Sequence, residues 1–158
     1  AQGNGTSFSN PNLAGLIACL WQAFPEFTNM QILDAVQRSS SKYTSPDDRV
    51  GFGIPNMPMA FEILVEKKRE KLLGNDWVKT FPNPFTTGVT IFIKANNTGK
   101  LYMQLTDMAG RILSTSQLDV QQGQYYTITQ NNLGSLPAGV YNLLLIDGKE
   151  KRTVRLVK

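Results

Sequence analysis

The spacing of the apolar residues changes once along this 158-residue chain, near residue 75. Before that point apolar side chains recur at helical spacing, whereas after Trp77 they alternate with polar ones, as in Val89, Ile91 and Ile93. Short alternating runs separated by turn-forming residues are typical of antiparallel β-structure. The chain is therefore predicted to be α+β, with about three helices followed by an antiparallel β-sandwich of about seven strands.

The same change of spacing predicts two domains. We place the helical portion at residues 1–72, a linker at 73–76 and the β-sandwich at 77–158. Within the sandwich, Asp147-Gly148 is a signal for a two-residue hairpin, because both residue types tolerate a positive φ angle.

Two segments of the first half carry the clearest helical patterns. Residues 13–24 are apolar on nearly every side, and a helix of that kind has to be covered all round. We therefore expect the isolated chain to self-associate. Thr28 and Gln31 form a T-x-x-Q capping box, so a second helix is expected from there to about Arg38.

The composition excludes several kinds of site within the chain. There is no histidine and a single cysteine, Cys19, so the chain supplies no histidine base, no histidine or cysteine-rich metal site and no internal disulfide. No metal and no cofactor are expected. The net charge of +4 comes entirely from residues 76–158, which contain nine basic and five acidic residues. Such a tail fits an anionic surface, but charge alone favours the solvated face of a terminal strand, and we expect no nucleic-acid partner.

The residues before the first helix form the one motif typical of catalysis. Gly5 permits a tight turn, and Ser7 is expected at or just before the first helical turn, after Thr6. Free backbone N–H groups at a helix start favour a developing negative charge, so an exposed serine there suits nucleophilic attack on a carbonyl. The commoner role of a serine at that place is an ordinary N-cap.

A family resemblance favours the catalytic interpretation. Gly5-Thr6-Ser7-Phe8-Ser9-x-Pro11, followed by Leu13-Ala14-Gly15, resembles the nucleophile block of the subtilisin-like serine proteases. The match continues in family order to Gly51-Phe52-Gly53-Ile54-Pro55-Asn56. The resemblance implies that Ser7 is the nucleophile of an Asp–His–Ser triad and that Gly5, Thr6 and Ser7 form its elbow.

In that family the Asp precedes the His and the His precedes the Ser. The resemblance therefore implies that both partners of Ser7, and the oxyanion-hole Asn, lie upstream of Ala1. The chain is then expected to be the C-terminal end of a longer secreted endopeptidase that acts on proteins or peptides, and to be inactive alone.

The second half carries a different combination of motifs: Pro82-Asn83-Pro84, Leu105-x-Asp107-x-x-Gly110-Arg111, Leu136-Pro137-x-Gly139-x-Tyr141 and a basic last strand with Lys151, Arg152, Arg155 and Lys158. This combination resembles the C-terminal sorting domain of type IX secretion substrates of Bacteroidetes. The resemblance implies a folded export signal that an outer-membrane translocon reads. It also implies removal of the domain in the linker, attachment of the protein to surface lipopolysaccharide, and a secreted or cell-surface location. The recognition residues are then Pro82, Asn83, Pro84, Gly139, Tyr141 and the four basic residues of the last strand.

Two alternatives stay open at this point. The sandwich is instead a non-catalytic adhesion or carbohydrate-binding module if its tyrosines, Tyr102, Tyr125, Tyr126 and Tyr141, line one platform. Aromatic residues in strands more often pack in cores and in cross-strand pairs. The basic residues of the last strand equally suit an edge strand that discourages pairing with other chains.

Overall fold

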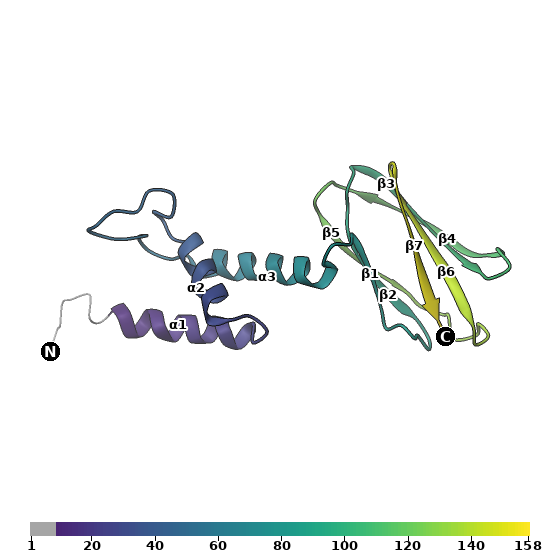
Figure 1. The fold of residues 1–158 in the computed structure, drawn as a ribbon, viewed down its shortest axis with the longest axis horizontal. Helices are drawn as coiled ribbons and strands as arrows, with labels where there is room; N and C mark the ends of the chain where they lie inside the picture. Colours follow the sequence, from purple (N-terminus) through teal and green to yellow (C-terminus); the bar gives the residue numbers. More distant parts are fainter. Residues whose placement is uncertain (1–8) are drawn as a thin grey trace. The chain divides into compact units, whose positions relative to one another are not determined.

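The structure is a computed structural model in which residues 9–158 are described. The chain divides into a helical unit that ends at Lys71 and a sandwich unit, Leu72–Lys158 (Figure 1). The helices are α1 (Ser9–Ala23), α2 (Asn29–Arg38) and α3 (Met57–Leu73). The expected elbow residues Gly5, Thr6 and Ser7 lie outside the described residues. Among residues 9–158, no helix combines the length and the hydropathy needed to cross a bilayer.

The capping box predicted for α2 is confirmed. The backbone N–H of Gln31 donates to Thr28 Oγ1 at 3.4 Å, and the backbone N–H of Thr28 donates to Gln31 Oε1 at 2.9 Å. Two of the N–H groups that a helix start leaves free are thereby satisfied. The helix ends at Arg38, as its sequence pattern predicts.

The core of the helical unit is small and leaves much of α1 uncovered. It is built from Leu20, Phe24, Phe27, Ile32, Ala35, Val36, Ala60 and Leu64. Leu20 is the buried residue of α1, whereas Leu16 and Trp21 of the same helix are 50% and 44% exposed. The all-round cover that the composition of α1 calls for is thus missing within the described chain.

The sandwich unit holds seven strands in two antiparallel sheets, which confirms the predicted fold class. The strands are β1 (Val78–Phe81), β2 (Val89–Lys94), β3 (Gly99–Asp107), β4 (Ile112–Val120), β5 (Tyr125–Gln130), β6 (Val140–Asp147) and β7 (Glu150–Val157). One sheet has the order β1-β2-β5 and the other β4-β3-β6-β7, so β7 is an edge strand. Alternate residues of β2, β3 and β6 face a shared core, among them Ile91, Leu105 and Leu143, each fully buried.

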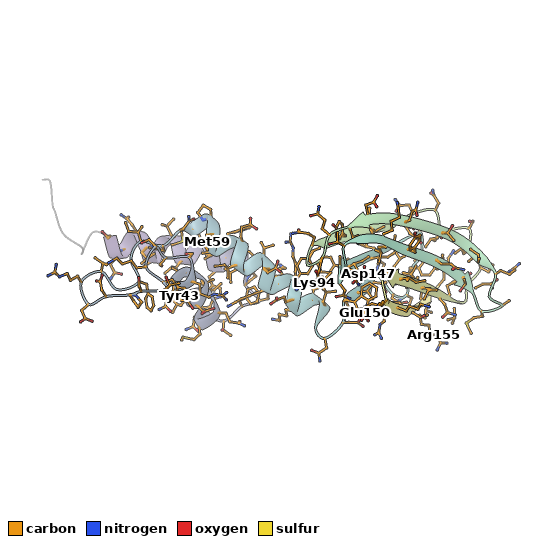
Figure 2. All side chains as sticks on the ribbon, turned by 90° about the horizontal axis from the view of Figure 1, so that it is seen from above. Tyr43, Met59, Lys94, Asp147, Glu150 and Arg155 are labelled. Atoms are coloured by element: carbon orange, nitrogen blue, oxygen red, sulfur yellow. The ribbon has the colours of Figure 1, made fainter. Side chains whose placement is uncertain are left out.

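The hairpin between β6 and β7 differs by one residue from the expected one. Asp147 pairs with Glu150, so the turn residues are Gly148 and Lys149 rather than Asp147 and Gly148. Of the two, only Gly148 has a positive φ, of 61°, as in a type II′ turn. Asp147, labelled in Figure 2, is 1% exposed and accepts hydrogen bonds from the backbone N–H groups of Asn96 at 2.6 Å and Asn97 at 3.2 Å. Its carboxylate therefore fixes the loop after β2, a long-range role that spacing does not indicate.

Candidate functional site

The helical unit contains no second catalytic constellation among its described residues. Ser39 to Lys42 match the pattern S-x-x-K, but Ser39 Oγ donates to the Val36 carbonyl at 2.8 Å and Lys42 forms an ion pair with Asp47. Asp47 also accepts hydrogen bonds from two backbone N–H groups of its own turn, at 2.9 Å each. The hydrogen bond from Lys42 is the main reason that the pKa of Asp47 lies below its ordinary value. These residues shape a helix exit and a turn, and no cluster of three metal-ligating side chains occurs in residues 9–158.

The Pro82-Asn83-Pro84 loop is bound to the outer edge of β7. The Asn83 side chain donates from Nδ2 to the carbonyl of Arg155 at 2.8 Å, and its Oδ1 accepts the backbone N–H of Val157 at 2.9 Å. The backbone N–H of Phe85 then donates to the Val157 carbonyl at 2.8 Å. A proline has no N–H to offer a neighbouring strand, so the amide of Asn83 takes over the pairing. The loop thereby covers the C-terminal half of an otherwise open sheet edge.

Tyr141 belongs to the core of the sandwich. Its side chain is 5% exposed, its hydroxyl donates to the Pro137 carbonyl at 2.6 Å, and its ring lies 6.0 Å from that of Phe85. A buried tyrosine needs such a partner for its hydroxyl. The Leu136-Pro137-x-Gly139-x-Tyr141 segment is therefore a loop that its own tyrosine holds in place.

Lys158 is bonded within the unit as well. Its ammonium donates to the carbonyls of Leu133 at 2.9 Å, Gly134 at 2.6 Å and Leu136 at 2.5 Å. Its backbone exchanges two hydrogen bonds with Gly139, at 2.9 and 3.1 Å. An ammonium has three donors, and all three are satisfied here. The last residue thus joins β7, the loop after β5 and the start of β6.

The three basic residues of β7 differ in whether their charge is paired within the unit. Arg152 forms an ion pair with Asp76, which lies just before β1. Lys151 and Arg155 are exposed and have side-chain charges free of ion pairs among the described residues (Arg155 is labelled in Figure 2). Of the four basic residues singled out in the sequence, these two offer their charge to solvent.

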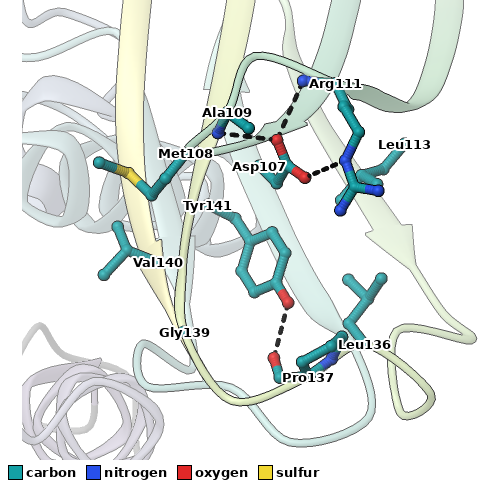
Figure 3. Close-up of a pocket in the computed structure, with 10 residues that line it drawn as sticks. All are labelled: Asp107, Met108, Ala109, Arg111, Leu113, Leu136, Pro137, Gly139, Val140 and Tyr141. Atoms are coloured by element: carbon teal, nitrogen blue, oxygen red, sulfur yellow. Dashed lines mark hydrogen bonds and ion pairs between the residues drawn. The ribbon is translucent and has the colours of Figure 1, made fainter.

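A pocket of about 300 Å³ lies between two of the motifs, and spacing alone does not reveal it. One wall is the turn from Asp107 to Arg111, and the other is the loop from Leu136 to Val140, with Tyr141 between them (Figure 3). Asp107 Oδ1 accepts the backbone N–H groups of Ala109 and Arg111, and its Oδ2 accepts Arg111 Nε at 2.7 Å. The side-chain hydrogen bond from Arg111 is the chief reason that the pKa of Asp107 is lowered. In the sequence, the signs of this pocket are the two motifs that contain Asp107 and Leu136. Their spacing along the chain does not indicate that they lie next to each other.

The four tyrosines do not form one platform. Tyr141 is in the core, and the hydroxyl of Tyr126 accepts the backbone N–H of Gln121 at 2.8 Å while its ring packs against that core. Tyr125 stacks on Phe92 in the three-stranded sheet, with an interplanar angle of 13°. Tyr102 is exposed on the four-stranded sheet. The hypothesis of a sugar-binding surface made of all four tyrosines is therefore wrong.

Comparisons with known proteins give results for both halves. The family model described as "Secretion system C-terminal sorting domain" matches residues 79–158, and the model of the Subtilase family matches residues 1–53. Among solved structures, the chain is similar to a DUF3244 family protein from Bacteroides vulgatus described as having an immunoglobulin-like β-sandwich fold. The identity is 20%, the TM-score is 0.41, and the match covers 52% of this chain and 84% of that one. No curated protein matches the chain.

Proposed function

This chain belongs to the family of secretion system C-terminal sorting domains, and we propose that its sandwich unit is read as a folded export signal by the type IX machinery. Membership in the family implies contact with that machinery and a secreted or cell-surface location. The observation that carries the proposal is that the motif residues bind one another. The side chains of Asn83, Tyr141 and Lys158 donate hydrogen bonds to backbone carbonyls. The acceptors are Arg155 of β7, Pro137 and Leu136, respectively. These motifs are separated in sequence and come into contact only when the unit is folded.

This arrangement divides the proposed recognition residues into two groups. Asn83, Tyr141 and Lys158 act by building the surface, since their polar groups are used within the unit, and Pro82 and Pro84 are exposed on either side of Asn83. Lys151 and Arg155 offer free charges that suit an anionic partner, and Arg152 does so less because Asp76 neutralises it.

The export proposal has a direct test. The full chain, preceded by a general-secretion signal peptide, is produced in type IX-competent cells and in otherwise identical cells without the translocon. We expect the chain in the medium or on the surface of the first and in the periplasm of the second. Retention in both, or release from both, contradicts the proposal.

The domain is further proposed to be removed in the segment 72–76, and the protein to be attached to surface lipopolysaccharide. Gly74 and Asn75 are exposed, which a protease requires, whereas Leu73 is 3% exposed. Cleavage is therefore expected at or next to Gly74 and Asn75. Mass spectrometry of the exported product checks this, and an intact segment from Leu73 to Asp76 in that product contradicts it.

For the helical unit we propose descent from a subtilisin-like serine endopeptidase in which Ser7 is the nucleophile. The Subtilase match over residues 1–53 supports this, and the lack of histidine in the chain means that the base comes from elsewhere in the parent. The 158-residue chain is then expected neither to react with a fluorophosphonate nor to hydrolyse casein. The parent carrying its Asp and His is expected to do both and to lose both with Ser7→Ala. Labelling of Ser7 in the 158-residue chain contradicts the proposal.

A further inference from the structure

Gly139 is a glycine that the fold does not require. Its φ lies outside the positive range, and an added Cβ would meet nothing within 4 Å. It pairs with Lys158 through two backbone hydrogen bonds, as any residue at the end of a ladder does. A glycine in such a place weakens a strand, and one reason to keep it is the close approach of another molecule.

The empty space beside Gly139 is the pocket of Figure 3. Gly139 directly precedes β6, and its two backbone hydrogen bonds with Lys158 continue the pairing of that strand, so we expect a Cβ there to point to the side of Tyr141. Both residues line the pocket between the Asp107 turn and the Pro137 loop. A side chain at position 139 would therefore occupy that pocket, and the glycine leaves it open.

The lining of the pocket has a simple chemistry. Its apolar residues are Met108, Ala109, Leu113, Leu136, Pro137, Val140 and Tyr141. Its acid, Asp107, has both oxygens engaged by backbone N–H groups and by Arg111 Nε. The guanidinium of Arg111 is oriented by that contact, while its side chain remains 80% exposed. The pocket thus offers an apolar cavity with the Asp107–Arg111 ion pair at its rim, in which Arg111 uses Nε and leaves its Nη donors to a further acceptor.

We propose that this pocket is a docking site for a protein segment that inserts one large apolar side chain and sets a neighbouring carboxylate against Arg111. The charge of the sandwich unit supports an acidic partner, since nine basic residues face five acidic ones there and Asp147 among the latter is buried. An oriented guanidinium pairs well with a carboxylate, and a central apolar anchor beside it is the usual make-up of an interface hot spot. That the segment belongs to the export machinery rests on the proposed function, whereas the binding chemistry does not.

The binding chemistry is tested without export. The isotope-labelled full chain is titrated with three peptides: acetyl-Asp-Phe-Asp-amide, acetyl-Lys-Phe-Lys-amide and acetyl-Asp-Gly-Asp-amide. We expect the first to shift the amide signals of Gly110, Arg111, Gly139 and Val140, and the other two to bind at least about tenfold more weakly. Arg111→Glu is expected to abolish the preference for the acidic peptide.

Gly139→Val is the sharper variant, because it fills the pocket at a site where its Cβ meets no neighbour and where the backbone φ suits any residue. Its melting temperature is expected to equal or exceed that of the wild type, while the peptide shifts disappear. Gly139→Ala is expected to give an intermediate affinity. Unchanged binding by a folded Gly139→Val, equal binding of the three peptides, or no shift with any of them overturns the docking site. Shifts of the same amides with lipopolysaccharide micelles alone also overturn it, in favour of a lipid.

Export of the same variants then identifies the partner. Gly139→Val and Arg111→Glu are expected to lower the exported fraction at least about tenfold, whereas Lys79→Glu, a matched charge reversal at an exposed residue of β1, leaves it unchanged. If the wild type is not exported, the proposed function fails while the peptide result stands. If Gly139→Val is exported like the wild type, this inference fails while the proposed function stands.

Discussion

Lys158 illustrates how much a single residue contributes to the sandwich unit. A lysine at the end of an edge strand would ordinarily have its ammonium in water, yet here the three donors meet carbonyls from a loop 22 to 25 residues away. The three carbonyls would otherwise need water or another donor. We infer that this residue stabilises the loop that forms one wall of the pocket.

Lys158→Met removes the ammonium and keeps most of the apolar stem. We expect a loss of about 1.5–3 kcal/mol in the free energy of unfolding, the size typical of hydrogen bonds to a charged group. Urea denaturation followed by near-ultraviolet circular dichroism measures it. Lys151→Met, at an exposed lysine of β7, is the matched control and should change stability much less. Equal effects of the two substitutions would contradict the role assigned to Lys158.

Asp107 connects the stability of the pocket to pH. Its hydrogen bond from Arg111 lowers the folded pKa below the ordinary value of 3.8. The stabilisation is therefore fully present above the unfolded pKa and is lost as the pH falls through the folded value. Asp107→Asn is expected to lower the melting temperature at neutral pH, with a difference from the wild type that shrinks in acid. A difference that stays constant or grows as the pH falls would contradict this sign.

At the scale of elements, β7 is an edge strand protected in two ways. Its C-terminal half is covered by the loop that contains Asn83, and its N-terminal half carries Lys151 and Arg152. Charged residues and covering loops are the usual means by which edge strands avoid pairing with other chains. The N-terminal half is also the part of this edge that the Asn83 loop leaves uncovered.

Asn83→Ala is expected to expose the C-terminal half of that edge. The backbone N–H of Val157 loses its acceptor, so its hydrogen exchange should accelerate at least about tenfold. The backbone N–H of Lys158, which is bonded to Gly139, is the internal reference and should accelerate less. Asn75→Ala, at an exposed asparagine before β1, is the control variant. Unchanged protection of Val157 would show that the loop does not cover the edge.

The elements themselves were predictable because each depends on local information. The capping box at Thr28 and the alternation from Val89 to Ile93 both act over a few residues. The contacts that build the site are not local. Asn83 binds Arg155 and Val157, which are 72 and 74 positions further along the chain. The turn at Gly148 was misplaced by one residue because the buried carboxylate of Asp147, a tertiary feature, keeps that residue in the strand.

At the scale of the whole molecule, the two units differ in how well they cover their apolar residues. The sandwich unit has a core shared by both sheets, with fully buried residues in β2, β3 and β6. In the helical unit, Leu16, Phe61 and Ile54 are 50%, 42% and 80% exposed, and α1 borders two apolar pockets. Exposed apolar surface of this kind is typical of an interface.

We accordingly expect the isolated chain to self-associate through the exposed face of α1. Sedimentation velocity over a range of concentrations should show species larger than 17.6 kDa. Leu16→Lys should shift the distribution toward the monomer, while Ile112→Lys, at an apolar residue of β4 that is 61% exposed, should not. A strictly monomeric wild type at every concentration would contradict this expectation.

The central claim is that the export signal is the folded sandwich rather than a stretch of sequence, and one export measurement tests it. Leu143→Glu places a charge at a fully buried position of β6, which should unfold the unit while leaving every motif in the chain intact. Thr127→Glu introduces the same charged side chain at an exposed position of β5. In type IX-competent cells we predict that the wild type and Thr127→Glu reach the cell exterior and that Leu143→Glu does not. Export of an unfolded Leu143→Glu chain at the wild-type level would contradict the account.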